Sequence, residues 1–113
     1  MDRFEIAPKE TERKLNWHEA KMYCFSLNVD GIVGWRLPTI KELQIVYEND
    51  HDFEMSWYWT SDPVTRGTVY DRDYPEAIND DYAKQIYMKF GEDDIDHKTH
   101  DFNWVRPVRD YKD

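Results

Sequence analysis

Two helix-start signals of the same design constrain this chain more than any other feature. Asn16 is followed three residues later by Glu19, and Thr39 is followed three residues later by Glu42. In such a capping box the first side chain accepts a backbone N–H of the first helical turn, and the glutamate accepts the N–H of the capping residue. Segment 28–34, Asn-Val-Asp-Gly-Ile-Val-Gly, lies between the two signals and is typical of a turn. The sequence therefore predicts two consecutive helices.

Each predicted helix carries apolar residues at helical spacing, which indicates one buried face. These residues are Trp17, Ala20, Cys24 and Leu27 in the first helix, and Ile40, Leu43, Val46 and Tyr47 in the second. Trp17 and Trp35 each sit beside a helix start with apolar neighbours, so both are predicted to be core residues.

The remaining pattern predicts strands and surface loops. After residue 49 large residues alternate with period two, which suits strands. Strands are predicted at residues 3–6, 57–61, 82–90 and 102–109. Turns or loops are predicted at residues 9–14, 62–81 and 91–101. Two helices followed by antiparallel strands indicate an α+β fold, and no linker or repeat divides residues 1–113, so we expect one domain.

Charge and composition exclude several functions. The 15 Lys and Arg residues against 24 Asp and Glu give a net charge of −9, which repels phosphate backbones, so no nucleic-acid partner is expected. No apolar run reaches the length of about 20 residues that crosses a bilayer, so no membrane partner is expected. The single Cys24 cannot form an internal disulfide, and the first residues do not resemble a signal peptide. We therefore expect a cytoplasmic protein, in a host cytoplasm or a virion if a phage encodes it.

Four motifs in a fixed order carry a family resemblance. They are Asn16-Trp17-His18-Glu19-Ala20 with Tyr23-Cys24, Gly34-Trp35-Arg36-Leu37-Pro38-Thr39 with Glu42-Leu43, Tyr58-Trp59-Thr60-Ser61, and Val105-Arg106-Pro107-Val108-Arg109. Over about residues 15–109 the chain resembles the Lcl C-terminal domain family, which is named for a collagen-like bacterial adhesin and also occurs in phage proteins. More distantly it is similar to the formylglycine-generating, sulfatase-modifying fold.

The resemblance implies a C-type-lectin-like fold, with two helices packed on a small antiparallel sheet and long surface loops. It implies function only loosely, because that scaffold hosts sugar binders, receptor-binding proteins and a few enzymes. The sulfatase-modifying enzymes use two cysteines late in the chain, whereas this chain has only Cys24, so that oxidation chemistry is not expected here.

Three arginines are candidates for structural clamps. Arg36 lies between two large apolar residues, so its guanidinium needs acceptors from helix ends, loops or a carboxylate. Arg106 and Arg109 are predicted to be similar clamps, although on an exposed face they would instead contact an anionic ligand.

Reactive and metal-binding groups are sparse in the sequence. His97 and His100, with Asp94 and Asp96, have ligand types that suit zinc, but the interpretation we favour is a solvated acidic loop. Cys24 falls on a buried stripe and is expected to be inert. No nucleophile elbow or glycine-rich phosphate loop is present, so neither enzymatic activity nor a cofactor is expected.

The sequence hypothesis is a non-catalytic recognition domain that binds a protein or a glycan through loops and exposed aromatic residues. The candidate contact residues are Trp57, Tyr58, Tyr70, Arg72, Tyr74 and Tyr82. An alternative is a small acidic inhibitor of a basic, nucleic-acid-binding host protein, suggested by acidic stretches at 48–54, 71–81 and 92–101. A third reading is a homo-oligomer or a subunit of a larger particle.

Overall fold

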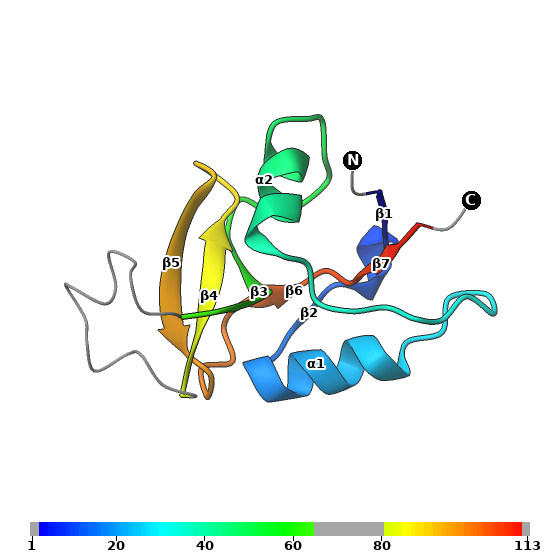
Figure 1. Ribbon diagram of the computed structural model, residues 1–113, viewed down its shortest axis with the longest axis horizontal. Coiled ribbons are helices and arrows are strands. Elements are labelled where there is room, and N and C mark those ends of the chain that lie inside the picture. The colour runs from blue at the N-terminus through cyan, green and yellow to red at the C-terminus, as the bar shows by residue number, and fades with distance from the viewer. Residues whose placement is uncertain (1–2, 65–80, 112–113) are drawn as a thin grey trace.

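The computed structural model describes residues 3–64 and 81–111, within which it places two α-helices and seven strands (Figure 1). The helices are α1 (Trp17–Ser26) and α2 (Ile40–Tyr47), and a 3-10 turn covers Lys9–Thr11. The strands are β1 (Phe4–Ile6), β2 (Arg13–Lys14), β3 (Trp57–Pro63), β4 (Tyr82–Tyr87), β5 (Glu92–His97), β6 (Trp104–Val105) and β7 (Val108–Asp110).

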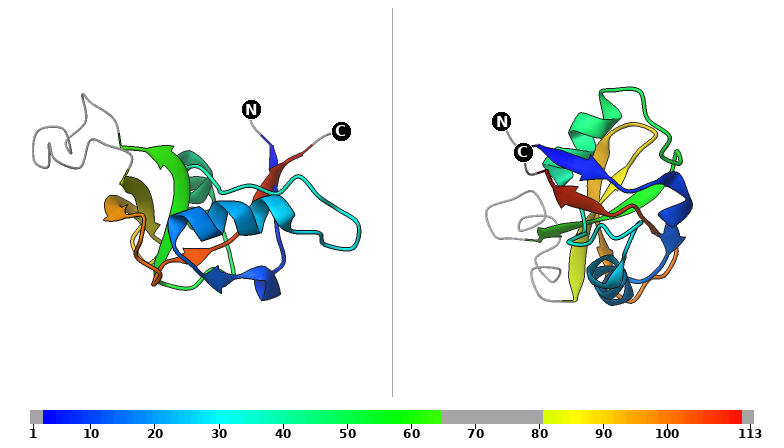
Figure 2. Two further views of the ribbon diagram at one scale, coloured as in Figure 1. Left: turned by 90° about the horizontal axis from the view of Figure 1, so that it is seen from below. Right: turned by 90° about the vertical axis from the view of Figure 1, so that its right-hand side faces the viewer.

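The strands form two sheets. The larger has five strands in the order β2-β6-β3-β4-β5, and its pairs are antiparallel except for the parallel contact of β3 with β6. The smaller pairs β1 with β7, the first and last strands, side by side near both chain ends (Figure 2). The predicted α+β class is therefore confirmed, with a mixed rather than purely antiparallel sheet.

Both predicted capping boxes are present. The Asn16 side chain accepts the Glu19 N–H at 2.8 Å, and the Glu19 carboxylate accepts the Asn16 N–H at 3.2 Å. At α2 the corresponding distances between Thr39 and Glu42 are 3.1 and 2.9 Å. The helix starts are thus fixed by local hydrogen bonds, as the spacing predicts.

The helices cover opposite faces of the five-stranded sheet, because neighbouring strand residues point to opposite sides. Tyr58 of β3 packs in a cluster with the buried face of α2, and Trp59 packs in a second cluster with Ala20 and Cys24 of α1. In Figure 1, α2 lies above β3 and β6, and α1 lies below them. Aromatic rings therefore fill the centre of both layers.

Three strand predictions were wrong. Residues 9–14 were expected to be a turn, but Arg13–Lys14 forms β2, which pairs with β6. Residues 91–101 were expected to be an acidic turn, but Glu92–His97 forms β5, which pairs along its whole length with β4. Residues 102–109 were expected to form one strand, but β6 and β7 join different sheets. Between them lie Arg106 and Pro107, and Pro107 has no N–H for a ladder.

Several side-chain expectations also need correction. Tyr47 is exposed rather than part of the buried face of α2, and its ring lies over Gly91. Strand β4 ends at Tyr87, short of the predicted residue 90, because the chain turns at Gly91 with φ +74°. Trp35 is buried as predicted, whereas Trp17 is half-buried beside the α1 cluster.

Candidate functional site

Arg36 joins the start of α2 to the last strand. Its guanidinium donates to both carboxylate oxygens of Glu42, at 2.8 and 2.7 Å, and to Asp110 of β7 at 2.8 Å. Backbone hydrogen bonds also pair Arg36 with Val108. Burial alone would raise the pKa of Glu42, but hydrogen bonds from Arg36 and Thr39 outweigh it and hold that pKa below its ordinary value of 4.5.

Arg106 is the most buried of the three arginines, with a side chain 4% exposed. It donates to the carbonyl of Ala7 at 2.6 Å and to Glu12 at 3.1 Å, and it forms an ion pair with Asp52 at 2.9 Å. Its guanidinium also lies 4.7 Å from the centre of the Phe53 ring. Arg106 thus ties the segments around Ala7, Glu12 and Asp52 to one point.

The Glu12 carboxylate shares this network with Tyr58. The Tyr58 hydroxyl donates to Glu12 at 2.6 Å and accepts the N–H of Glu54 at 2.7 Å. The other Glu12 oxygen lies 2.8 Å from the Lys9 ammonium. Burial first, and then the hydrogen bond with Glu12, raises the pKa of Tyr58. Tyr58 is therefore a fixed part of the interior.

Arg109 makes fewer contacts than Arg106, and it makes them near the surface. It pairs with Glu5 across the β1–β7 sheet at 3.0 Å and donates to the Val33 carbonyl at 3.0 Å. Its guanidinium lies 5.9 Å from the centre of the Trp35 ring. All three arginines are therefore engaged with the protein's own groups.

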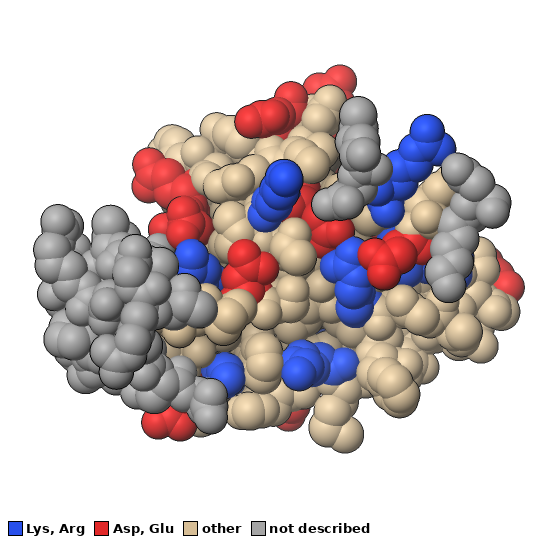
Figure 3. Space-filling view, viewed as in Figure 1, with Lys and Arg blue, Asp and Glu red and all other residues tan. Residues whose placement is uncertain are grey.

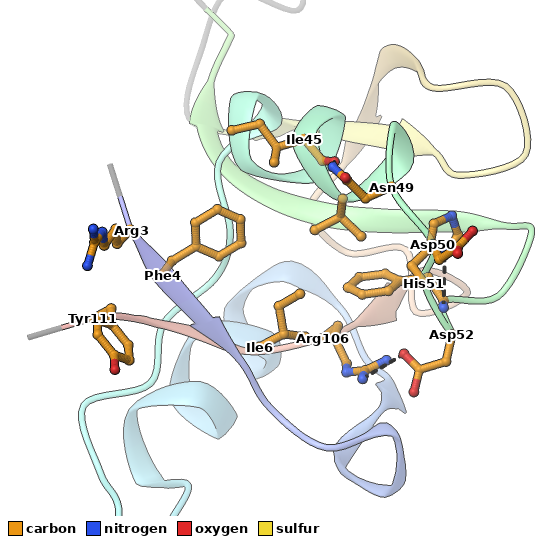
Figure 4. Close-up of a pocket in the computed structure, with 12 residues that line it drawn as sticks. Arg3, Phe4, Ile6, Ile45, Asn49, Asp50, His51, Asp52, Arg106 and Tyr111 are labelled. Carbon is orange, nitrogen blue, oxygen red and sulfur yellow. Dashed lines mark hydrogen bonds and ion pairs between the residues drawn. The ribbon is translucent and has the colours of Figure 1, made fainter. Parts of the chain in front are cut away.

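A groove of about 910 Å³ lies where β1, α2 and the loop after α2 meet, and we call it the β1–α2 groove (Figure 4). Phe4 and Ile6 extend into it from β1, and Ile45 lies across from them on α2. Its other lining residues are Arg3, Val46, Asn49, Asp50, His51, Asp52, Phe53, Arg106 and Tyr111. A second hollow of about 640 Å³ shares Arg3, Phe4 and Ile45 and extends past Arg36 to Asp110.

The groove combines an apolar floor with a charged end. Asp50, His51 and Asp52 lie together at one end, on the loop that follows α2. His51 is held by the backbone, since its Nδ1 accepts the Phe53 N–H at 3.1 Å. Figure 3 shows acidic side chains at the top of this face of the molecule, over the same loop. Such a groove offers apolar contact along its floor and, at this end, the exposed carboxylate of Asp50.

The structure places the three described contact candidates in different surroundings. Tyr58 is fully buried, so its assignment as a surface contact was wrong. Trp57 is half-buried and stacks on Tyr87 with ring centres 4.9 Å apart. Tyr82 contacts His97 edge to face at 5.1 Å. The three other candidates, Tyr70, Arg72 and Tyr74, lie outside the described residues.

The histidine cluster is arranged around hydrogen bonds. His100 pairs with Asp96, and the Nδ1 of His97 lies 2.7 Å from the Thr99 hydroxyl. Asp94 accepts the N–H of Ile95 at 2.8 Å. Across residues 3–64 and 81–111, no group of three or more His, Cys, Asp or Glu side chains is placed to hold a metal ion.

The cysteine is in the α1 cluster, where burial raises its thiol pKa to about 12. At neutral pH the Cys24 thiol is therefore protonated and a weak nucleophile. No helix in the part of the chain that the structure describes is long and apolar enough to cross a membrane.

The groove residues were missed in the sequence because they come from four separate segments. Phe4 and Ile6 were assigned only to a strand, and Phe53 and Tyr111 only to connecting or terminal segments. One signal was available: Ile45 is apolar but falls outside the buried stripe of Ile40, Leu43 and Val46, so it had to face another surface.

Two comparisons with known proteins bear on this chain. The model of the Lcl C-terminal domain family matches residues 5–109, which is nearly the whole chain. No curated protein matches it.

Proposed function

Because this chain belongs to the Lcl C-terminal domain family, we propose that it is a non-catalytic recognition domain whose ligand, a protein or a glycan, binds in the β1–α2 groove. The C-type-lectin-like architecture that the motifs resemble is part of this proposal. The location replaces the one expected from the sequence, since Tyr58 is buried and neither Trp57 nor Tyr82 lines the groove.

The observation that carries the proposal is the exposed apolar surface of the groove. Ile6 is 39% exposed, Ile45 is 41% exposed and Tyr111 is 50% exposed, and all three line the same hollow. Contiguous apolar surface rimmed by polar groups is typical of an interaction site. The surrounding frame is rigid, because Arg106 holds the Ala7 and Asp52 sides of the groove together.

The polar groups nearest the groove support ligand binding rather than catalysis. Arg106 is paired with carboxylates, and His51 accepts a backbone N–H. The one thiol of the chain lies in the α1 cluster, on the far side of the sheet, and burial raises its pKa. An apolar floor with a few fixed polar groups supplies contact area and orientation for a ligand.

The proposal is tested by capture from host lysate and by a glycan array, each run with wild type and two variants. Ile45→Glu places a charge in the groove at an exposed position, so the protein should still fold. Met22→Glu is the matched control, because Met22 is 73% exposed on α1 and lies outside the groove. We expect a protein or glycan that wild type and Met22→Glu retain and Ile45→Glu loses. A ligand retained by all three proteins would place recognition elsewhere and overturn the proposal.

A second candidate function is inhibition of a basic host protein, and the loop after α2 favours it. Glu48, Asp50, Asp52 and Glu54 follow one another at alternate positions, and all four are exposed. Asp52 and Glu54 are paired with Arg106 and Lys9. A charge-based inhibitor should lose affinity steeply as salt rises from about 0.05 to about 0.5 M, whereas binding on apolar surface should change little.

A further inference from the structure

We infer that the ligand of the β1–α2 groove is an extended polypeptide segment bearing lysine or arginine, which adds as a third strand to the edge of β1 that faces away from β7. The inference rests on the proposed function and specifies its ligand. Three features support it. They are the alternation along β1 of residues that do and do not bond to β7, the position of the groove along that strand, and the charge at the end of the groove.

The register of the β1–β7 pair decides which backbone groups of β1 are available. Tyr111 donates its N–H to the Arg3 carbonyl, and Ala7 donates its N–H to the Pro107 carbonyl. In an antiparallel pair, hydrogen-bonded and non-hydrogen-bonded pairs alternate, so Glu5 and Arg109 are also a hydrogen-bonded pair. The odd-numbered residues of β1 therefore face β7.

The backbone groups of Phe4 and Ile6 consequently point to the opposite edge of β1. Among residues 3–64 and 81–111 no strand pairs with that edge, since β1 pairs only with β7. The same alternation is present on β7. Val108 is the partner of Ile6, and its N–H and carbonyl bond to Arg36, away from β1. Two residues of β1 thus offer two donors and two acceptors to an added strand.

The groove runs along this edge. Arg3 and Phe4 both line it, although their side chains point to opposite faces of the two-stranded sheet. An added strand would lie about 4.8 Å from β1, and alternate side chains of that strand would point into the groove. The exposed Ile6 and Ile45 side chains would then contact apolar residues of the added segment. This is the geometry of recognition by strand addition.

The charges at one end of the groove favour a basic residue in the bound segment, since Asp52 there is paired with Arg106 and the other lining arginine, Arg3, lies at the opposite end (Figure 4). Asp50 lines the groove and Glu48 lies two residues before it, and both are exposed. A lysine or arginine on the added strand would meet these carboxylates. A second copy of this chain fits less well, because each copy carries a net charge of −9. A glycan would make no use of the strand edge.

The test begins with a random heptapeptide library displayed on phage and selected on the full-length protein. We expect enrichment of peptides in which apolar residues alternate and at least one lysine or arginine is present. The tightest binder is then synthesised with N-methyl groups on one alternate set of residues or on the other. Because only one set faces β1, one methylated peptide should lose about tenfold or more in affinity and the other should bind as before.

Two variants of the protein test the same edge. Ile6→Pro removes the outward N–H, which makes no bond to β7, and proline is tolerated on an edge strand. Ile6→Ala is the matched control, because it shortens the side chain and keeps the N–H. Ile6→Pro should weaken the peptide by about tenfold relative to Ile6→Ala. Amide hydrogen exchange gives a direct readout. The bound peptide should slow exchange at the Phe4 and Ile6 amides, whereas the Glu5 amide should already exchange slowly without the peptide.

The outcomes separate this inference from the function on which it rests. Equal effects of the two methylated peptides, or unchanged exchange at Phe4 and Ile6, would overturn strand addition. If Ile45→Glu still abolishes binding in that case, the groove remains the recognition site and only its mode of recognition is wrong. If no peptide is enriched and a glycan or a second copy binds instead, the inference fails and the identity of that ligand replaces it.

Discussion

Among single residues, Arg106 has the largest consequence for the fold. It is buried, it has two carboxylate partners and one carbonyl partner, and it touches segments far apart in the sequence. Buried ion pairs add little net stability, but the loss of one partner is costly because the other charge stays buried. The pair of Arg106 with Glu12 is therefore important because its disruption would leave a buried carboxylate without its guanidinium partner.

Arg106→Met should lower the free energy of unfolding by about 3 kcal/mol, because the buried Glu12 carboxylate would lose its guanidinium and be left with the partly exposed Lys9 ammonium. Arg109→Met is the control: its pair with Glu5 is near the surface, and we expect a loss of about 1 kcal/mol or less. Urea unfolding monitored by tryptophan fluorescence measures both. Equal losses in the two variants would contradict the central role of Arg106.

Glu42 should make stability depend on pH in acid. Its pKa is lowered in the folded protein, so the unfolded chain binds the proton more readily and the stabilisation is fully present above the unfolded pKa. It is lost as the pH falls below the ordinary value of 4.5 and through the lower pKa of the folded protein.

We therefore expect the unfolding free energy to fall less steeply over this pH range in Glu42→Gln than in wild type. Asp62, whose pKa is raised by burial, acts in the opposite direction in both proteins, so the informative quantity is the difference between them. Thermal unfolding at several pH values measures it. Parallel curves for the two proteins would show that Glu42 does not titrate as described.

At the scale of elements, the turn between β4 and β5 depends on Gly91. Its φ of +74° is in the left-handed region, and an added Cβ would lie 2.7 Å from the Tyr47 ring. Gly91→Ala should cost about 2–4 kcal/mol, from backbone strain and from the clash together.

Gly31→Ala is the matched control for the Gly91→Ala substitution. Gly31 also has a positive φ, +87°, but no atom lies within 4 Å of an added Cβ. Strain alone should then cost about 1 kcal/mol. Melting temperatures of the two variants make the comparison, and a Gly31→Ala loss as large as that of Gly91→Ala would remove the role assigned to Tyr47.

Elements with strong local signals were predictable, and those that depend on distant partners were not. The helices α1 and α2 follow from their capping boxes, which use hydrogen bonds within one turn. Strand β5 has mainly acidic residues and no apolar alternation, because among the described residues it is an edge strand whose backbone pairs only with β4. Its sequence therefore resembles a loop.

For the whole molecule, the pairing of β1 with β7 joins the beginning and the end of the described chain. Deletion of residues 1–7 would remove this pair, the Phe4 contact with the core and the Ala7 carbonyl that binds Arg106. We expect the melting temperature to fall by about 10 °C or more. Phe4→Ala in the full chain separates loss of the ring from loss of the strand, and a deletion no worse than this variant would contradict the prediction.

The candidate site was less predictable than the fold because it is assembled from segments that lie far apart in sequence. The arginines Arg36 and Arg106 were recognisable because a guanidinium between apolar neighbours needs partners, but the partners Asp110 and Asp52 were not. The groove depends on how β1 sits beside α2, which no local pattern encodes. The aromatic residues that the sequence predicts as contacts include one, Tyr58, that is fully buried in the core.

The adjacency of Arg3 and Tyr111 has a mechanical consequence. Their shared backbone hydrogen bond places the entry and exit of the described chain at one end of the β1–β7 ribbon. A pulling force applied at both ends would open that ribbon like a zipper, breaking one hydrogen-bonded pair at a time instead of shearing all of them together. Tension would therefore peel β1 away before it loaded the five-stranded sheet, and the groove beside β1 would be the first part of the molecule to be lost under load.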